Sequence, residues 1–142
     1  MSRIIHTNSP GTQRQRVRRT IAEVLRRLME KNGFDDEARD LAALIVFSLR
    51  ELSAGVDRSA SAWEKRGYFL KADRFRRDWE WVDSAADELE TLIRGEEWMR
   101  LPVVLARLVP RFADVKVQRL TRSPAVWQNC YQRLLETELS AT

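Results

Sequence analysis

Four carboxylates stand at helical spacing in one stretch of the chain, at Glu80, Asp83, Asp87 and Glu90. Spacings of three and four residues place side chains on one side of an α-helix. Like charges this close repel one another, so the row is expected to be solvated, to pair with arginines, or to hold a divalent cation through its oxygen atoms. These four residues are therefore the candidate metal ligands of the sequence.

A second acidic pair, Glu37 and Asp40, has the same three-residue spacing near the start of another expected helix. All-α nucleoside triphosphate pyrophosphatases hold magnesium between facing helices that each offer carboxylates three residues apart. Those enzymes keep their two acidic pairs closer in sequence, and nothing else in this chain matches them. A metal-dependent phosphohydrolase or nucleotide pyrophosphatase is therefore only an alternative hypothesis.

The N-terminal end of the chain is strongly basic. Residues 1–32 hold eight basic residues and two acids, whereas the rest of the chain is net negative. Such an end could neutralise a nucleic-acid backbone or an acidic protein, but no base-reading motif is present. Alternatively, the arginines pair with the acids of residues 80–90, in the same molecule or in its partner. The candidate contact residues are Arg3, Arg14, Arg16, Arg18 and Arg19.

Nucleophilic chemistry has few candidate residues here. The single histidine, His6, lies in the N-terminal arm, and the single thiol, Cys130, falls on an apolar helix face. A Ser-His-Asp or Cys-His site would have to recruit that arm, and the chain contains no zinc-ligand spacing, phosphate loop or dinucleotide motif. The sequence therefore assigns no catalytic residue and no cofactor, which favours a binding protein over an enzyme.

The carboxylate row belongs to the most regular stretch of the chain, residues 68–94. Apolar residues recur there at alternating spacings of four and three, which predicts one long amphipathic helix at the centre of a bundle. Trp81 lies off this seam, and with Phe69 and Leu70 it is a candidate for a protein interface. The seam consists of Tyr68, Ala72, Phe75, Trp79, Val82, Ala86, Leu89 and Ile93.

The stretches before and after residues 68–94 predict further helices. The capping pattern of Thr12 and Gln15 predicts a first helix over 12–31, closed by a left-handed Gly33. A second helix is expected from Asp35 to about 66, with a turn at Gly67 rather than a continuous helix. Prolines divide residues 96–120 into two or three short helical pieces. Ser123 with Pro124 predicts a last helix that ends near residue 138.

Two ion pairs are expected along the first helix, Glu23–Arg27 and Arg26–Glu30, because each joins opposite charges four residues apart.

These elements predict an all-α, single-domain helical bundle of five or six helices, because no stretch alternates as a strand does. The expected parts are a flexible basic arm (1–11), the bundle (12–138) and a C-terminal tail (139–142). The longest apolar run, seven residues from Leu41 to Phe47, is far shorter than the roughly 20 residues of a membrane span. One cysteine permits no internal disulfide and suits a reducing compartment, so we expect a cytoplasmic protein without a membrane partner.

The function that these patterns favour is non-enzymatic binding of a macromolecular partner. The Arg-rich N-terminus would contact a nucleic-acid backbone without sequence preference, or an acidic protein. A protein partner or a homo-oligomer is expected because Phe69, Leu70 and Trp81 lie off the central seam and are available for an interface. The metal-dependent phosphohydrolase and a structural subunit of an oligomeric assembly remain the two alternatives.

Overall fold

The computed structural model describes residues 9–137 and shows an all-α fold, as the sequence predicts. Within these residues no strand occurs, and none of the helices is long and apolar enough to cross a membrane. Residues 1–8 of the expected arm (1–11), including Arg3 and His6, and the last residues of the chain, 138–142, lie outside the described part. The α-helices are α1 (Pro10–Met29), α2 (Asp36–Lys65), α3 (Phe69–Trp79), α4 (Trp81–Arg94), α5 (Leu101–Leu108) and α6 (Cys130–Glu136). Short 3-10 turns are η1 (Trp98–Arg100), η2 (Val109–Phe112) and η3 (Pro124–Val126).

Helix α1 begins two residues before the expected start. Its cap is Ser9, whose hydroxyl accepts a hydrogen bond from the backbone amide of Thr12, and Pro10 occupies the first helical position. Proline suits that position because its missing amide has no helical partner there. The predicted inner face is correct, since Val17, Ile21, Val24, Leu25 and Leu28 are all buried.

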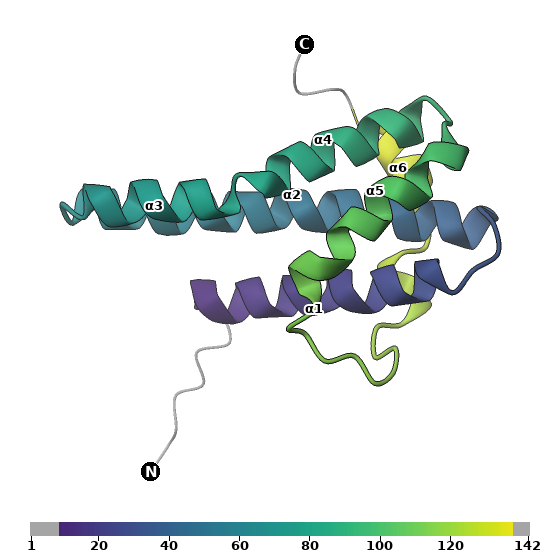
Figure 1. The fold of residues 1–142 in the computed structure, drawn as a ribbon, viewed down its shortest axis with the longest axis horizontal. Coiled ribbons are helices and arrows are strands. Elements are labelled where there is room, and N and C mark those ends of the chain that lie inside the picture. Colours follow the sequence, from purple (N-terminus) through teal and green to yellow (C-terminus); the bar gives the residue numbers. More distant parts are fainter. Residues whose placement is uncertain (1–8, 138–142) are drawn as a thin grey trace.

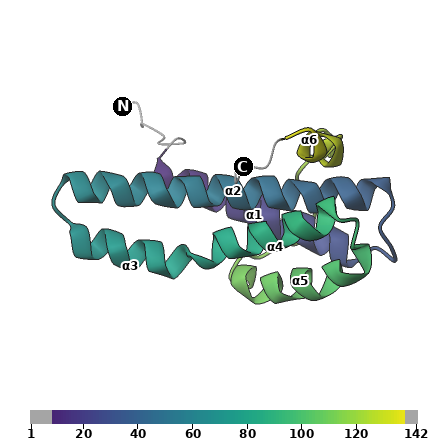
Figure 2. The same cartoon turned by 90° about the horizontal axis from the view of Figure 1, so that it is seen from above.

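Helix α2 occupies the middle of the bundle and runs the length of the molecule (Figures 1 and 2). It contacts α1, α3, α4 and α6, and nearly every residue from Leu41 to Leu49 is buried. A helix that is apolar on all sides requires neighbours on all sides. The central position therefore belongs to α2, whereas the sequence pattern assigns it to residues 68–94.

The α2–α3 hairpin turns at Gly67, where a turn is predicted. Gly67 has φ +84°, a left-handed conformation that glycine adopts without steric penalty. Gly33, for which the same conformation is predicted, does not have a positive φ. Beyond the turn, α3 returns along α2 and extends past the start of α1 (Figure 1).

The predicted helix over 68–94 is helical along most of its length but is divided at Glu80. The Glu80 amide bonds to the Arg77 carbonyl three residues back instead of four. Side chains two residues apart point to different sides of a regular helix, yet the rings of Trp79 and Trp81 stack with centroids 6.2 Å apart. The break places Trp81 against the core beside Phe112, so this residue, predicted to lie off the seam and to be available for a protein interface, instead packs within the chain.

After α4 the chain forms short pieces, as the prolines predict, with α5 packed on the core between η1 and η2. The last helix starts later than Ser123 and Pro124 predict. Asn129 is left-handed (φ 64°), and α6 follows it from Cys130. Asp40 of α2 accepts hydrogen bonds from the amides of Asn129 and Tyr131, which fixes the start of α6 against α2.

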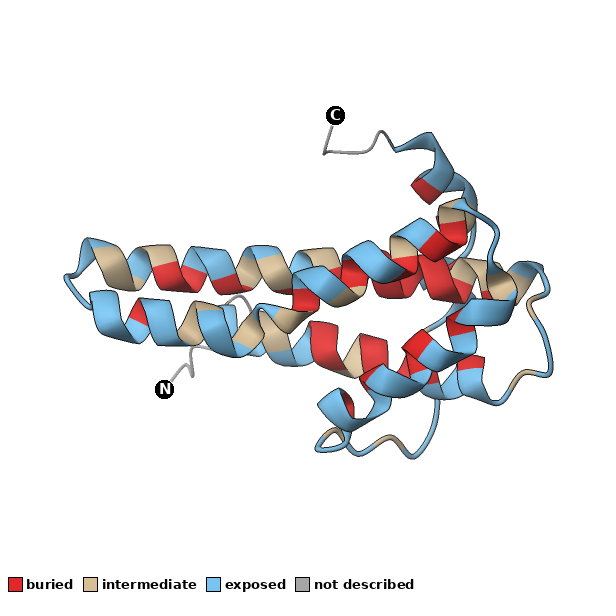
Figure 3. Ribbon diagram, turned by 45° about the horizontal axis from the view of Figure 1, so that its top comes forward, coloured by how far each residue is buried: buried red, intermediate tan, exposed pale blue. Residues whose placement is uncertain are grey.

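The hydrophobic core lies in one half of the molecule, where α1, α4 and α5 meet the first half of α2 (Figure 3). Helix α3 contributes a single buried residue, Ala72. Val56 and Ala60 of α2 are also buried, but they lie outside the main core cluster. The molecule therefore combines a well-packed half with a thin two-helix extension.

Candidate polyanion-binding face

The predicted arginines of α1 are partly committed to contacts within the chain. Arg18 is buried, donates to both carboxylate oxygens of Asp114 at 2.6 and 2.8 Å, and also bonds to the carbonyl of Arg111. Arg14 donates to the Ser59 hydroxyl at 3.2 Å and lies over the ring of Phe75, and burial lowers its pKa. Arg14 and Arg18 therefore pack α1 against its neighbours.

Segment 113–123, the irregular chain after η2, lies along the outer side of α1. Arg19 donates to the carbonyl of Lys116, and Arg26 donates to the carbonyl of Val117. In the opposite direction, Arg122 reaches the Arg16 carbonyl at 3.1 Å and the Thr20 hydroxyl at 3.0 Å. An irregular segment needs partners for its backbone polar groups, and the long side chains of α1 supply them.

Glu23 is the carboxylate that joins α1 to this segment. Although only 1% exposed, it accepts hydrogen bonds from the Thr121 amide and hydroxyl and from the Arg122 amide. It also pairs with Arg19 at 2.9 Å. Burial alone would raise the pKa of Glu23, but these hydrogen bonds and the charge of Arg122 outweigh it, so the pKa lies below its ordinary value.

The expected pairs along α1 are not the ones that form. Glu23 contacts Thr121 and Arg122 rather than Arg27, whose guanidinium instead contacts Glu37 at 3.0 Å. Arg26 is directed to the Val117 carbonyl rather than to Glu30. Distant partners prevail because segment 113–123 covers this side of α1.

Because segment 113–123 lies along α1, basic residues of the two elements adjoin one another, and we call this set of residues the basic face. Helix α1 and the segment together contain nine basic residues and two acids, and both acids, Glu23 and Asp114, are already paired. Sequence reasoning found the α1 residues but missed those of the segment, whose position beside α1 no local pattern indicates. The basic face comprises Arg16, Arg19, Arg26, Lys116, Arg119 and Arg122.

The carboxylate row lies along α3–α4, and half of it meets an arginine of α2. Arg50 contacts Asp87 at 2.8 Å and Glu90 at 3.0 Å, and Arg94 also contacts Glu90. Burial would raise the pKa of Glu90, but the two arginines lower it overall. Glu80 and Asp83 are exposed. Asp87 and Glu90 therefore pair with arginines, but these arginines belong to α2 and α4 rather than to the first helix, from which the sequence expects them.

The other acidic pair is not placed opposite this row. Glu37 contacts Lys31 at 2.8 Å, and Asp40 accepts the backbone amides at the start of α6. Over residues 9–137, no group of three or more His, Cys, Asp or Glu side chains is arranged to hold a metal ion. Cys130 is buried, and burial raises the pKa of its thiol, which disfavours the reactive thiolate.

Comparisons of the chain with protein-family models, with curated proteins and with solved structures found no match. The basic face therefore has to be interpreted from its own geometry.

Proposed function

We propose that this protein is a non-enzymatic binding protein whose basic face contacts a nucleic-acid backbone without sequence preference. The observation that supports this is the packing of segment 113–123 along α1, which adds Lys116, Arg119 and Arg122 to the α1 arginines. A surface of this kind binds by neutralising phosphates and releasing their counterions. Contacts to phosphates position a protein but carry no sequence information.

The internal contacts of the basic face leave most of its positive charge in place. Arg19 and Arg26 each donate to a carbonyl of the segment, and a carbonyl does not neutralise a guanidinium. Only carboxylates do so, and Glu23 is shared between Arg19 and Arg122. Because the segment is already held on α1, little conformational freedom is lost on binding, which favours affinity.

The sharpest test changes exposed charges that have no structural role. Arg18 is unsuitable because its loss would leave Asp114 unpaired, so we choose Lys116→Gln with Arg119→Gln, both exposed. Each lost phosphate contact should reduce the slope of log affinity against log salt by about 1. We therefore expect the double variant to bind a short oligonucleotide several-fold more weakly at low salt, with a slope smaller by about 2.

The matched control removes the same charge from the far hairpin, through Lys65→Gln with Arg74→Gln, which are also exposed. Fluorescence anisotropy with single-stranded and double-stranded oligonucleotides of several sequences measures all three proteins. The control should bind like the unchanged chain. Equal losses in the two variants, or no binding by the unchanged chain at low salt, would refute the proposal.

A further inference from the structure

A pocket lies between α1 and η2, at the point where the chain leaves η2 for segment 113–123, and we call it the α1–η2 pocket. Its volume is about 440 Å³, within the range of roughly 300–1,000 Å³ for small-molecule sites. Apart from Arg26 and Glu30, every residue that lines it is apolar. Two of these apolar residues, Met29 and Val109, are 46% and 45% exposed. The pocket is therefore an open apolar site whose specificity depends on two charged side chains.

Arg26 and Glu30 differ in what they contact. They lie four residues apart on α1 and so share one side of the helix. Arg26 donates to the carbonyl of Val117, which also lines the pocket, whereas no hydrogen bond or ion pair within residues 9–137 holds the Glu30 carboxylate. An ionised carboxylate accepts hydrogen bonds but donates none. The mouth of the pocket therefore offers a free acceptor beside a guanidinium that is already held in place.

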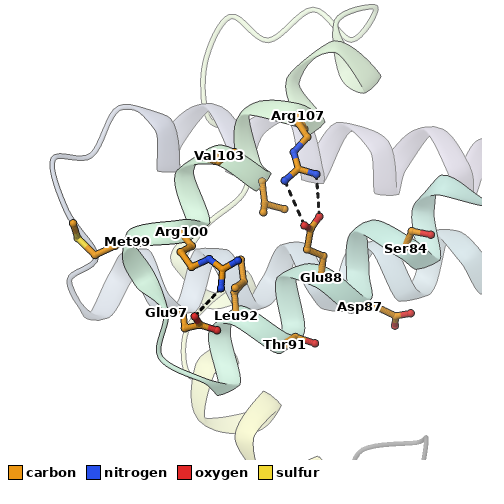
Figure 4. Close-up of a pocket in the computed structure, with 11 residues that line it drawn as sticks. Ser84, Asp87, Glu88, Thr91, Leu92, Glu97, Met99, Arg100, Val103 and Arg107 are labelled. Atoms are coloured by element: carbon orange, nitrogen blue, oxygen red, sulfur yellow. Dashed lines mark hydrogen bonds and ion pairs between the residues drawn. The ribbon is translucent and has the colours of Figure 1, made fainter.

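The larger hollow between α4 and α5, of about 790 Å³, differs because every charged side chain that lines it is paired within the chain. Figure 4 shows Glu88 of α4 and Arg107 of α5 reaching toward each other across it, with Glu97 beside Arg100 at its other end. Asp87, the remaining charged residue of its lining, pairs with an arginine of α2. The charges of this hollow therefore indicate no ligand.

The α1–η2 pocket adjoins the basic face. Arg26 belongs to both, and Val115 and Val117, which line the pocket, flank Lys116 of the basic face in the chain. Arg19 donates to the Lys116 carbonyl and so holds this stretch on α1. A nucleotide whose phosphate lies on Lys116 or Arg26 would thus have its base next to the mouth of the pocket.

The charges at the mouth determine what kind of group enters. Glu30 would repel an anion and Arg26 would repel a cation, which favours a neutral group. A nucleobase is neutral, has apolar faces and carries hydrogen-bonding groups on its edge. Building on the proposed function, we infer that the α1–η2 pocket binds an unpaired base of a single strand that lies on the basic face. Glu30 accepts a hydrogen bond from the exocyclic amino group of that base.

This contact gives the pocket a preference among bases. Cytosine, adenine and guanine carry an amino group, whereas thymine presents a carbonyl oxygen where cytosine has its amino group. That oxygen would face the Glu30 carboxylate with no proton between them. A base that is paired in a duplex is not free to enter. The basic face stays indifferent to sequence, and the pocket adds a preference for single strands with amino-bearing bases.

Fluorescence anisotropy at low salt compares two single strands of equal length, one of thymidine alone and one in which cytidine alternates with thymidine. Both strands offer the same number of phosphates, so the basic face contributes equally to their affinities. We expect the unchanged chain to bind the strand with cytidine about fivefold more tightly, the lower end for such a contact, because Glu30 is exposed. A duplex of the same length reports the basic face alone.

Two variants remove the preference by different routes. Glu30→Gln supplies an amide that also donates to the thymine carbonyl, so the two strands should bind equally tightly. Ala113→Leu adds bulk to the lining at an exposed position and should likewise bring the ratio of the two affinities toward one. The matched control, Ala62→Leu, changes an exposed alanine of α2 outside the pocket and should keep the preference. None of the three should bind the duplex more weakly than the unchanged chain, and circular dichroism shows whether each keeps its helices.

The outcomes separate this inference from the proposed function. Equal affinity of the unchanged chain for the two strands, with binding of the duplex retained, would overturn the inference and leave the proposed function in place. A preference that survives either Glu30→Gln or Ala113→Leu would also overturn it. So would a dimer in sedimentation velocity that Ala113→Leu dissociates, since a second copy would then fill the pocket. Absence of binding to all three nucleic acids would refute both proposals.

Discussion

Glu23 is the residue on which the attachment of segment 113–123 depends most. Glu23→Gln replaces one accepting oxygen with an amino group that faces donors from Thr121 and Arg122. Because these groups are partly buried, we expect a loss of about 1–3 kcal/mol in the free energy of unfolding. Urea denaturation measures this loss, and hydrogen exchange should show faster exchange at the Thr121 and Arg122 amides.

The control for this change is Glu30→Gln, an exposed residue at the end of the same helix. Its effect on the free energy of unfolding should stay within about 0.5 kcal/mol. If the two variants are equally stable, Glu23 does not hold the segment.

Asp114 gives a prediction about pH. The Arg18 guanidinium lowers the pKa of this carboxyl to about 2, whereas an unfolded aspartate titrates near 3.9. A lowered pKa in the folded state means that the pair stabilises the fold above pH ~4 and that this stabilisation disappears as pH falls toward ~2. An NMR titration of Asp114 should show the low pKa, and Arg18→Met should return it toward the ordinary value. An unchanged pKa in that variant would contradict the pairing.

The partners of these residues could not be predicted from sequence. Local spacing suggested Glu23–Arg27, but Glu23 bonds to Thr121, 98 residues away, and Arg18 bonds to Asp114, 96 residues away. A helical spacing shows which side chains are near enough to pair along one helix. It does not show that a distant, irregular segment will cover that side and offer better donors, because such a segment has no periodicity.

Among the turns, Gly67 is the one that requires glycine. Its φ of +84° is strained for any residue with a Cβ, and no neighbouring atom lies within 4 Å of the place a Cβ would occupy. Gly67→Ala should therefore lower the free energy of unfolding by about 1–2 kcal/mol through backbone strain alone. Gly33→Ala, at a glycine without a positive φ and equally free of neighbours, should be neutral or slightly stabilising. The midpoints of urea denaturation measure the stability of the two variants. Equal midpoints for Gly67→Ala and Gly33→Ala would contradict this account of the turn.

The division of α3 from α4 shows where sequence patterns fail for a whole element. The seam from Ala72 to Ile93 keeps helical spacing through Glu80, so periodicity predicts no break. The break follows from packing, since the stacking of Trp79 on Trp81 and the contact of Trp81 with Phe112 require a local change of helical phase. Phe112 belongs to another element, which the pattern within 68–94 does not include.

At the scale of the whole molecule, the all-α class and most core residues follow from the sequence, but the choice of central helix does not. A helix with one apolar side shows a clear helical period in its apolar residues, as residues 82–93 do. Helix α2 is buried on several sides around residues 41–49, so its apolar residues are nearly continuous and its period is weak. Helix α2, which is the most buried, therefore has a less regular spacing of apolar residues than residues 68–94.

The uneven core predicts uneven stability. Helix α3 buries only Ala72, whereas Ala86 of α4 lies within the main core cluster. A helix with few buried contacts can open without global unfolding, so native-state hydrogen exchange should show smaller opening free energies in α3 than in residues 41–49.

Ala72→Gly and Ala86→Gly form a matched pair, since each costs about 1 kcal/mol in helix propensity. We expect Ala72→Gly to speed exchange in α3 while the slowest amides of α2 keep their rates, and Ala86→Gly to speed those slowest amides as well. If both changes speed the slowest amides equally, the hairpin and the core unfold as one unit.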